Sequence, residues 1–303
     1  MSTQRDTPAA THAGDVVRQG DVLVMGAVAY DPKVVTIWTG FRTYLLEGGL
    51  PFDYVLYSNY ERQVEDLVAG RVHAAWNSPL AWIRAHRLAR AAGSSVWPLA
   101  MRDSDCDLSS VIVVRNESLL EELTDLRGRV MATGAVDSPQ ATLLPLDHLR
   151  QAGLRPGSDV EVRRFDVGVG LHGDHVGGER DAARALAAGE VDAACMIDSN
   201  YLLFGQEGVL APGTTRVLAQ TSAFDHCNMT ASSSAPPDLA RLFGDLLLAM
   251  DYADPAIRPL LDLEGLKQWR PGRELGYRPL ERAVDEAGFY DAKGGLTAVG
   301  YRP

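Results

Sequence analysis

The side chains in this chain that are best suited to chemistry are histidines and cysteines outside the apolar runs. Imidazole combined with thiolate or carboxylate is the ligand set of zinc and other first-row transition metals, and the candidate metal ligands are His172, His175, His226 and Cys106. His172 and His175 lie in a glycine-rich stretch and lack the i, i+4 spacing that would place both on one helix face. We therefore keep a bound zinc or other first-row metal as one interpretation.

Cys227 offers a second chemistry, because a thiolate activated by a neighbouring base is a nucleophile. The adjacent His226 is a poor candidate for this base, since neighbouring residues in a strand point to opposite faces. His172 or His175 would have to activate the thiol, so the candidate catalytic residues are His172, His175 and Cys227. The alternative is that Cys227 is a buried structural thiol, and both interpretations stay open.

A predicted helix start provides a candidate ligand site. A buried strand is expected at 129–133, after which Asp137 or Ser138 can be the N-cap and Pro139 fits the first helical position. The free N–H groups and the dipole of a helix that follows a parallel strand attract polar ligands. Asp137 would repel a phosphate or phosphonate there. It is therefore either only a cap or part of a site with a counter-cation, a protonated aspartate or a different ligand.

Alternating strands and helices are expected to position these residues. Apolar runs separated by glycine and proline predict strands at 22–29, 52–57 and 72–76 and helices near 34–46 and 60–69. This order predicts a parallel sheet with right-handed crossovers. The segment VEDLVAGRVHAAW at 64–76 is echoed by ARALAAGEVDAAC at 183–195, and polar residues follow both. The echo predicts two similar lobes with polar loops at their strand ends.

Composition excludes several classes of partner. The chain has 303 residues and a formal net charge of −11, which argues against nucleic acid and anionic membrane surfaces because both bind basic faces. No stretch is apolar enough to span a bilayer. The first residues contain no basic start followed by an apolar run, so we expect no secretory signal. We therefore expect the cysteines to be free thiols and the chain as written to be cytoplasmic.

Several short motifs resemble those of one family. They are Tyr60-x3-Val64-x2-Leu67-x-Ala-Gly-x-Val72, Ser110–Arg115, Leu123-x-Asp125-Leu126-Arg127-Gly128, Ala188–Ala193, Trp269 and Tyr277-x-Pro279-Leu280-x3-Val284. Together with the order of the elements, they resemble the phosphonate-binding (PhnD-like) branch of the substrate-binding proteins of ABC transporters, a family that is usually exported. Where that family usually has a Ser/Thr-rich phosphonate loop, this chain has Asp137–Thr142.

The resemblance implies an α/β fold of the two-lobe type 2 periplasmic-binding-protein kind, with mostly parallel sheets and a ligand cleft between the lobes. The boundaries we expect are a flexible tail at 1–20, a discontinuous first lobe at 21–110 and 225–290, a second lobe at 111–224, and a tail at 291–303. Two crossover strands would join the lobes and let them close like a hinge.

The resemblance also places loops from both lobes around one cleft. The ligand contacts we expect in these loops are Asn77, Ser78, Asp137, Ser138, Gln140 and Thr142. Tyr30 and Tyr60 are added because each directly follows a predicted strand and lies at or before a helix start. The resemblance would bring His172, His175 and His226 together across the closed cleft, with Cys106 and Cys227 nearby.

Two functions are compatible with this cleft. The first is the binding of a small polar organic molecule by a homologue of the phosphonate-type substrate-binding proteins. The second is an intracellular enzyme on the same fold, a lyase or hydrolase that uses cleft histidine, cysteine and aspartate side chains with or without a metal. Because one fold serves receptors and enzymes alike, only the site decides between them. The ligand and the oligomeric state do not follow from the sequence.

Overall fold

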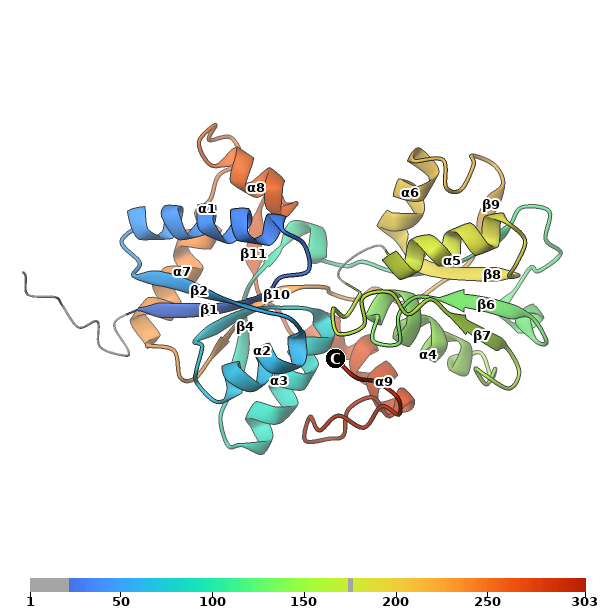
Figure 1. Ribbon diagram of the computed structural model, residues 1–303, viewed down its shortest axis with the longest axis horizontal. Helices are drawn as coiled ribbons and strands as arrows, with labels where there is room; N and C mark the ends of the chain where they lie inside the picture. The colour runs from blue at the N-terminus through green and yellow to red at the C-terminus, as the bar shows by residue number, and fades with distance from the viewer. Residues whose placement is uncertain (1–21, 174–176) are drawn as a thin grey trace, which may run out of the picture.

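The computed structural model describes residues 22–173 and 177–303, which form two lobes side by side along the long axis of the molecule (Figure 1). Within these residues, the first lobe is built on a six-stranded sheet in the order β11-β4-β10-β3-β1-β2. Its strands are β1 (Leu23–Val28), β2 (Phe52–Tyr57), β3 (Ala74–Asn77), β4 (Val96–Arg102), β10 (Asn228–Ser232) and β11 (Trp269–Pro271).

Helices cover both faces of this sheet. One face carries α1 (Lys33–Glu47), α7 (Pro237–Leu248) and α8 (Arg258–Glu264), and the other carries α2 (Tyr60–Val68) and α3 (Pro79–Ala91). In α1 the apolar residues Ile37, Phe41 and Leu45 recur every four positions and are buried against the sheet. Asn59 and Ser78 cap α2 and α3, because their side-chain oxygens accept hydrogen bonds from backbone N–H groups of the first turn.

The second lobe is built on a five-stranded sheet in the order β7-β6-β8-β5-β9. Its strands are β5 (Ser110–Arg115), β6 (Val130–Thr133), β7 (Glu161–Arg164), β8 (Ala193–Ile197) and β9 (Thr215–Gln220). The helical segments are η2 (Leu123–Leu126), the π-helical turn η3 (Pro139–Leu143), α4 (Leu144–Gln151), α5 (Gly177–Ala187) and α6 (Asp198–Gln206). Two separate apolar clusters, one on each face of the sheet, form its core.

The predicted two-lobe α/β fold is confirmed, but both sheets are mixed instead of mostly parallel. In each lobe, the strand that arrives from the other lobe runs antiparallel to its neighbours: β10 in the first lobe and β5 in the second. A crossover strand enters its sheet from the opposite end, so its direction opposes that of the strands joined by helices. No helix in the described part of the chain is both long enough and apolar enough to cross a membrane.

Two extended segments join the lobes. Residues 103–109 lead from β4 to β5, and residues 221–227 lead from β9 back to β10. They pair at Leu108 and Phe224, whose backbone N–H groups donate to each other's carbonyl oxygens at 2.9 and 2.8 Å. A Cβ at Gly276 would come within 2.0 Å of Asp225 Oδ2, so glycine is required where the chain passes the second segment.

The C-terminal part of the chain contacts both lobes. Helix α9 (Arg278–Ala287) packs against α3 of the first lobe and α4 of the second, and the chain ends between the lobes (Figure 1). The loose tail expected after residue 290 is not found, because Tyr301 is only 5% exposed and its hydroxyl group hydrogen-bonds to buried side chains. We call residues 288–303 the C-terminal strap.

Candidate ligand-binding site

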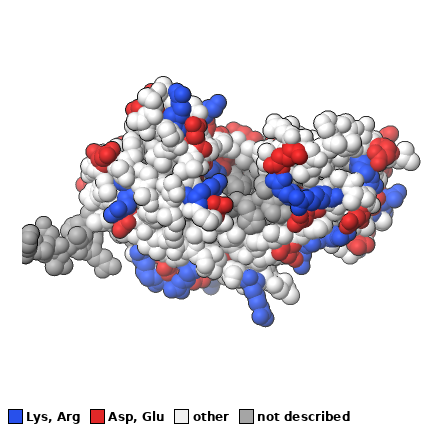
Figure 2. Space-filling view, turned by 45° about the horizontal axis from the view of Figure 1, so that its top comes forward, with Lys and Arg blue, Asp and Glu red and all other residues white. Residues whose placement is uncertain are grey.

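A cavity of about 400 Å³ lies between the lobes, where Figure 2 shows the surface hollowed. The first lobe contributes Tyr30, Trp76, Arg102, Asp105, His226 and Cys227, and the second contributes Gln140, Gly173, Ile197, Ser199 and Asn200. Tyr30, Gln140 and Asn200 follow the carboxyl ends of β1, β6 and β8. This edge of an open α/β sheet is the usual place for a ligand.

Only two of the eight predicted ligand contacts, Tyr30 and Gln140, line this cavity. Asn77 belongs to a buried network in the first lobe, since its side chain accepts a hydrogen bond from Gln63 and donates one to Thr230. The others, which are Tyr60, Ser78, Asp137, Ser138 and Thr142, are buried away from the cavity. Most of them serve contacts between the lobes or cap a helix.

His172 joins the second lobe to the first. It precedes α5 in a left-handed backbone conformation with φ of 51°, and its ring is completely buried. Its Nδ1 lies 2.7 Å from Ser78 Oγ, its Nε2 lies 3.0 Å from Glu61 Oε1, and its ring stacks on Tyr60 with centroids 4.8 Å apart. Ser78 and Tyr60 therefore hold the lobes together instead of facing the cavity.

Glu61 lies at the centre of this interlobe contact. Its Oε1 also accepts hydrogen bonds from the hydroxyl groups of Tyr290 and Tyr301, each at 2.9 Å. Burial alone would raise the pKa of Glu61, but the charge and hydrogen bond of His172, together with both tyrosine hydroxyls, lower this pKa to about 2. The carboxylate is thus ionised, and its Oε1 receives all of these contacts, whereas Oε2 is buried without a hydrogen-bond partner among the described residues. We call Glu61, His172, Tyr290 and Tyr301 the interlobe clasp.

Asp137 and Ser138 have separate roles. Ser138 is the N-cap, because its Oγ accepts a hydrogen bond from the Ala141 N–H at 3.2 Å. Asp137 Oδ2 instead accepts from the backbone N–H groups of Gly170 and His172, at 2.6 and 3.2 Å. The interpretation of Asp137 as the cap is therefore wrong, and its carboxylate fills a pocket of backbone donors within its own lobe.

The start of η3 is covered by the loop that carries His172. A Cβ at Gly173, where φ is +74°, would lie 2.5 Å from Ser138 Oγ, so the loop packs directly on the helix start. Gln140 Nε2 donates to the carbonyl oxygen of Gly173 at 2.8 Å. The helix start predicted to receive a polar ligand is thus occupied by the chain itself.

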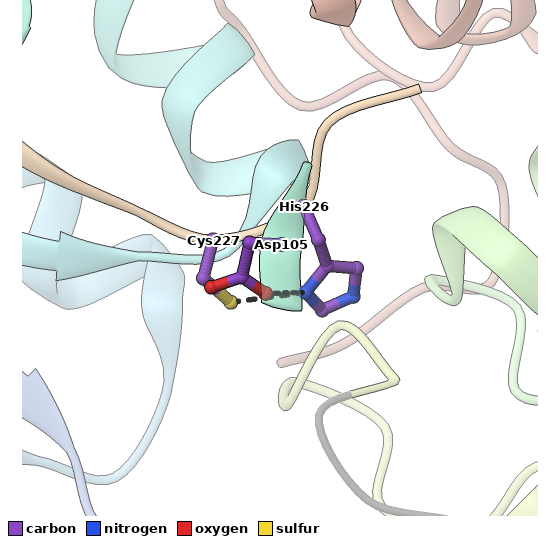
Figure 3. A group of neighbouring side chains, drawn as sticks. All are labelled: Asp105, His226 and Cys227. Atoms are coloured by element: carbon purple, nitrogen blue, oxygen red, sulfur yellow. Dashed lines mark hydrogen bonds and ion pairs between the residues drawn. The ribbon is translucent and has the colours of Figure 1, made fainter. Parts of the chain in front are cut away.

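Asp105, His226 and Cys227 form a compact group at the cavity (Figure 3). His226 Nδ1 lies 3.1 Å from Cys227 Sγ and 3.5 Å from Asp105 Oδ1. The expectation that His226 and Cys227 point to opposite faces is wrong, because His226 lies in the irregular segment before β10 and not in a strand. Cys227 is paired with this histidine, and His172 is hydrogen-bonded elsewhere.

The side chains of this group are of the types that bind metals, but the Asp105 carboxylate already forms an ion pair with the guanidinium group of Arg102. Arg102 donates to Asp105 Oδ2 at 2.5 Å and to Oδ1 at 2.9 Å. Burial would raise the pKa of Asp105, but Arg102 and His226 keep this pKa below its ordinary value. A divalent cation would have to displace or approach the guanidinium group, so the group fits a metal poorly.

The four predicted metal ligands do not come together among the described residues. Only His226 belongs to the group at the cavity. Cys106 Sγ donates to the Arg102 carbonyl oxygen at 3.4 Å, and burial raises the pKa of this thiol. His172 belongs to the interlobe clasp, and His175 lies outside the described residues.

A buried carboxylate lies behind the second-lobe wall of the cavity. Glu179 accepts hydrogen bonds from the Gln140 side chain at 3.0 Å, the Asn200 side chain at 2.8 Å and the Ile197 N–H at 3.0 Å. Burial raises the pKa of Glu179, and these three hydrogen bonds and the nearby His226 oppose the rise. No lysine or arginine of the described chain forms an ion pair with it. Glu179 thus orients the two polar side chains that face the cleft.

The sequence analysis missed Arg102 as a site residue. A signal was present, because Arg102 ends β4 and the acid it binds lies three residues further on, at the entry to the crossover. The Arg102 guanidinium group also lies 5.2 Å from the centre of the Trp76 ring and pairs with Glu264 at 3.4 Å. It thereby ties together the first-lobe wall of the cavity.

Known proteins resemble this chain in both sequence pattern and fold. A family model described as ABC transporter, phosphonate, periplasmic substrate-binding protein matches residues 26–277. The fold is similar to that of PhnD1 from Prochlorococcus marinus in complex with methylphosphonate, at 17% identity over 89% of this chain and 99% of that one, with a TM-score of 0.64.

Two further structures support the same fold. XAC2383 from Xanthomonas citri, bound to ATP, is 18% identical over 88% of this chain and 96% of its own, with a TM-score of 0.67. A binding protein component of an ABC phosphonate transporter (PA3383) from Pseudomonas aeruginosa is 12% identical over 87% of this chain and 85% of its own, with a TM-score of 0.59. Because the family model spans most of the chain, the protein belongs to the family of periplasmic substrate-binding proteins of phosphonate ABC transporters.

Proposed function

We propose that this protein is a substrate-binding protein that holds a small polar organic molecule in the cleft between its lobes. The observation that carries the proposal is a cavity of about 400 Å³ lined by polar and aromatic side chains from both lobes. A cavity of this size suits a metabolite of modest size. PhnD1, which shares the fold, is in complex with a ligand of this kind, methylphosphonate.

The fold supports the same function. The lobes are joined by two extended segments that pair at Leu108 and Phe224, and a change in a few backbone angles there would open and close the cleft. A ligand held by Gln140 and Asn200 on one side and His226 and Trp76 on the other would favour the closed arrangement, because only that arrangement supplies both sets of contacts.

Isothermal titration calorimetry of the purified protein against small phosphonates, sulfonates and amines tests the proposal. Replacing Gln140 with Ala should weaken binding at least about fivefold, since it removes a hydrogen-bonding side chain from the cavity wall. The matched control is Gln206→Ala, a change at an exposed glutamine at the end of α6. Equal affinities of the two variants would place the ligand outside this cavity. The absence of binding to any member of the panel would count against the function itself.

A further inference from the structure

We infer that the ligand of this cleft is an amine, with ammonium or N–H donors and no free oxyanion; the inference rests on the proposed function. Three independent features carry it. They are the occupied helix start at η3, the pairing of the partly buried cation Arg102 at the cavity, and the buried acceptors of the second-lobe wall.

The first feature is Asp137. Asp137 is fully buried, and its Oδ2 accepts hydrogen bonds from the backbone N–H groups of Gly170 and His172 at 2.6 and 3.2 Å and from the Tyr301 hydroxyl group at 3.4 Å. These donors would suit an oxyanion, but the chain supplies its own carboxylate. The second-lobe helix start is also covered by Gly173, which packs on Ser138. A phosphonate would meet a carboxylate and a closed surface there.

The second feature is the charge balance of the cavity. The charged residues that line it are Lys33, Arg102, Asp105, Asp262 and Glu264. Arg102 is already paired with both Asp105 and Glu264, whose side chains are each 3% exposed. The only other cation in the lining, Lys33, is exposed. A ligand dianion would therefore find no unpaired buried cation in the cleft and an excess of acids around it.

The third feature is the pair of acceptors on the second-lobe wall. Gln140 is 3% exposed, and its Nε2 donates to two acceptors, the Gly173 carbonyl oxygen and Glu179 Oε1. These contacts define the amide orientation, and Gln140 Oε1 is left without a hydrogen-bond partner among the described residues. Behind it, Glu179 is buried with no lysine or arginine partner in the described chain. An ammonium group at this wall would supply a donor to Oε1 and a positive charge to Glu179.

The aromatic residues of the opposite wall fit the same ligand. Tyr30 and Trp76 both line the cavity, and their ring faces carry partial negative charge that favours a cation. The Trp76 ring already accepts the Arg102 guanidinium group at 5.2 Å. Lys33 Nζ likewise lies 5.8 Å from the centre of the Tyr30 ring. This wall thus already places two cations of the chain against aromatic rings, the kind of contact that an ammonium group makes.

The test compares two matched sets of probes by calorimetry at near-neutral pH. The amine set is ethanolamine, 3-aminopropanol and propylamine, and the oxyanion set is methylphosphonate, ethylphosphonate and methanesulfonate. We expect binding within the amine set and at least tenfold weaker binding of each amine-free oxyanion. Tighter binding of the oxyanion set would overturn the ligand class and leave the receptor function standing. Binding of neither set would overturn both proposals.

Two variants probe the mechanism. Glu179→Gln removes the buried negative charge and should weaken amine binding about tenfold, whereas the control Glu161→Gln, on the exposed edge strand β7, should not. Asp105→Asn releases one partner of Arg102 and should raise the affinity for methylphosphonate. Melting curves show whether each variant is folded. Unchanged amine affinity in a folded Glu179→Gln variant would contradict the inference, as would unchanged methylphosphonate affinity in a folded Asp105→Asn variant.

Discussion

Glu61 and His172 show how a buried acid and base can replace an expected ligand contact. The sequence marked His172 as a site residue, but its two ring nitrogens are used by Ser78 and Glu61 of the other lobe. Removing one partner of a buried ion pair is costly, because the other charge is then left without compensation. The hydroxyl groups of Tyr290 and Tyr301 add hydrogen bonds to the carboxylate, which makes the pair tolerable in a dry environment.

Acid should weaken the fold through Glu61. Its pKa is lowered from the ordinary 4.5 to about 2 on folding, so its ionised form stabilises the folded state. That stabilisation, about 3 kcal/mol at most, is complete above the unfolded pKa and is lost as the pH falls toward the folded pKa. The free energy of unfolding measured in urea at about pH 6 and about pH 3 should fall more in the wild type than in Glu61→Gln.

An exposed glutamate serves as the control for this measurement. Glu117 pairs with Arg115 but its side chain is 74% exposed, so Glu117→Gln should keep the acid sensitivity of the wild type. If Glu61→Gln lost as much stability on acidification as Glu117→Gln, the clasp would not depend on an ionised Glu61.

At the scale of elements, the C-terminal strap is the part of the fold that the sequence concealed. Glycine-rich sequence without apolar periodicity is typical of a mobile end. The anchors of the strap include Tyr290, whose hydroxyl group bonds to Glu61 across 229 residues, and Tyr301. The partners of Tyr301, which are Glu61, Asp137 and His172, lie 240, 164 and 129 residues away in the sequence. Contacts this distant leave no local pattern, so the strap could not be predicted.

Replacing Tyr301 with Phe should destabilise the protein by about 1–3 kcal/mol, because it removes a buried hydrogen bond to a charged carboxylate. Urea unfolding monitored by tryptophan fluorescence measures this loss. Tyr54→Phe is the matched control, since its hydroxyl bonds to Thr39 at an exposed position and its removal should cost less than about 0.5 kcal/mol. Equal losses in the two variants would show that the strap hydroxyl contributes nothing specific.

The elements that could be predicted are those with local signals. Strand runs and helix caps located most of the two sheets, and the residues that follow strands, Tyr30 and Gln140, do line the cavity. The positions that could not be predicted depend on tertiary packing within each lobe. Ser138 lies in a stretch whose sequence is typical of a ligand-binding loop, but Gly173, from a separate loop, packs on Ser138 and covers it. Arg102 lines the cavity and pairs both with the nearby Asp105 and with Glu264, which lies far away in the sequence.

At the scale of the whole molecule, three connections hold the lobes in place. The crossover segments form the hinge, α9 packs on both lobes, and the interlobe clasp lies across the cleft. We expect the crossover segments to let the lobes rotate, whereas the clasp joins side chains of both lobes and is made only when the lobes meet. The clasp therefore biases the protein toward the closed arrangement before a ligand binds, which reduces the cost of closure during binding.

Removing the buried acid and the imidazole of the clasp together should open the molecule. In the double variant Glu61→Gln, His172→Gln neither member of this buried pair is left without its partner, so the lobes should stay folded while the bias toward closure is lost. Small-angle X-ray scattering without ligand should give a larger radius of gyration than for the wild type. If only about one tenth of the variant is closed, the apparent Kd should rise about tenfold, because affinity scales with the closed fraction.

The control is the double variant Asp238→Asn, Arg241→Gln, which removes an ion pair exposed on α7. A radius of gyration and a Kd equal to those of this control would mean that the hinge and α9 alone hold the lobes together, and that the clasp stabilises the protein without influencing closure.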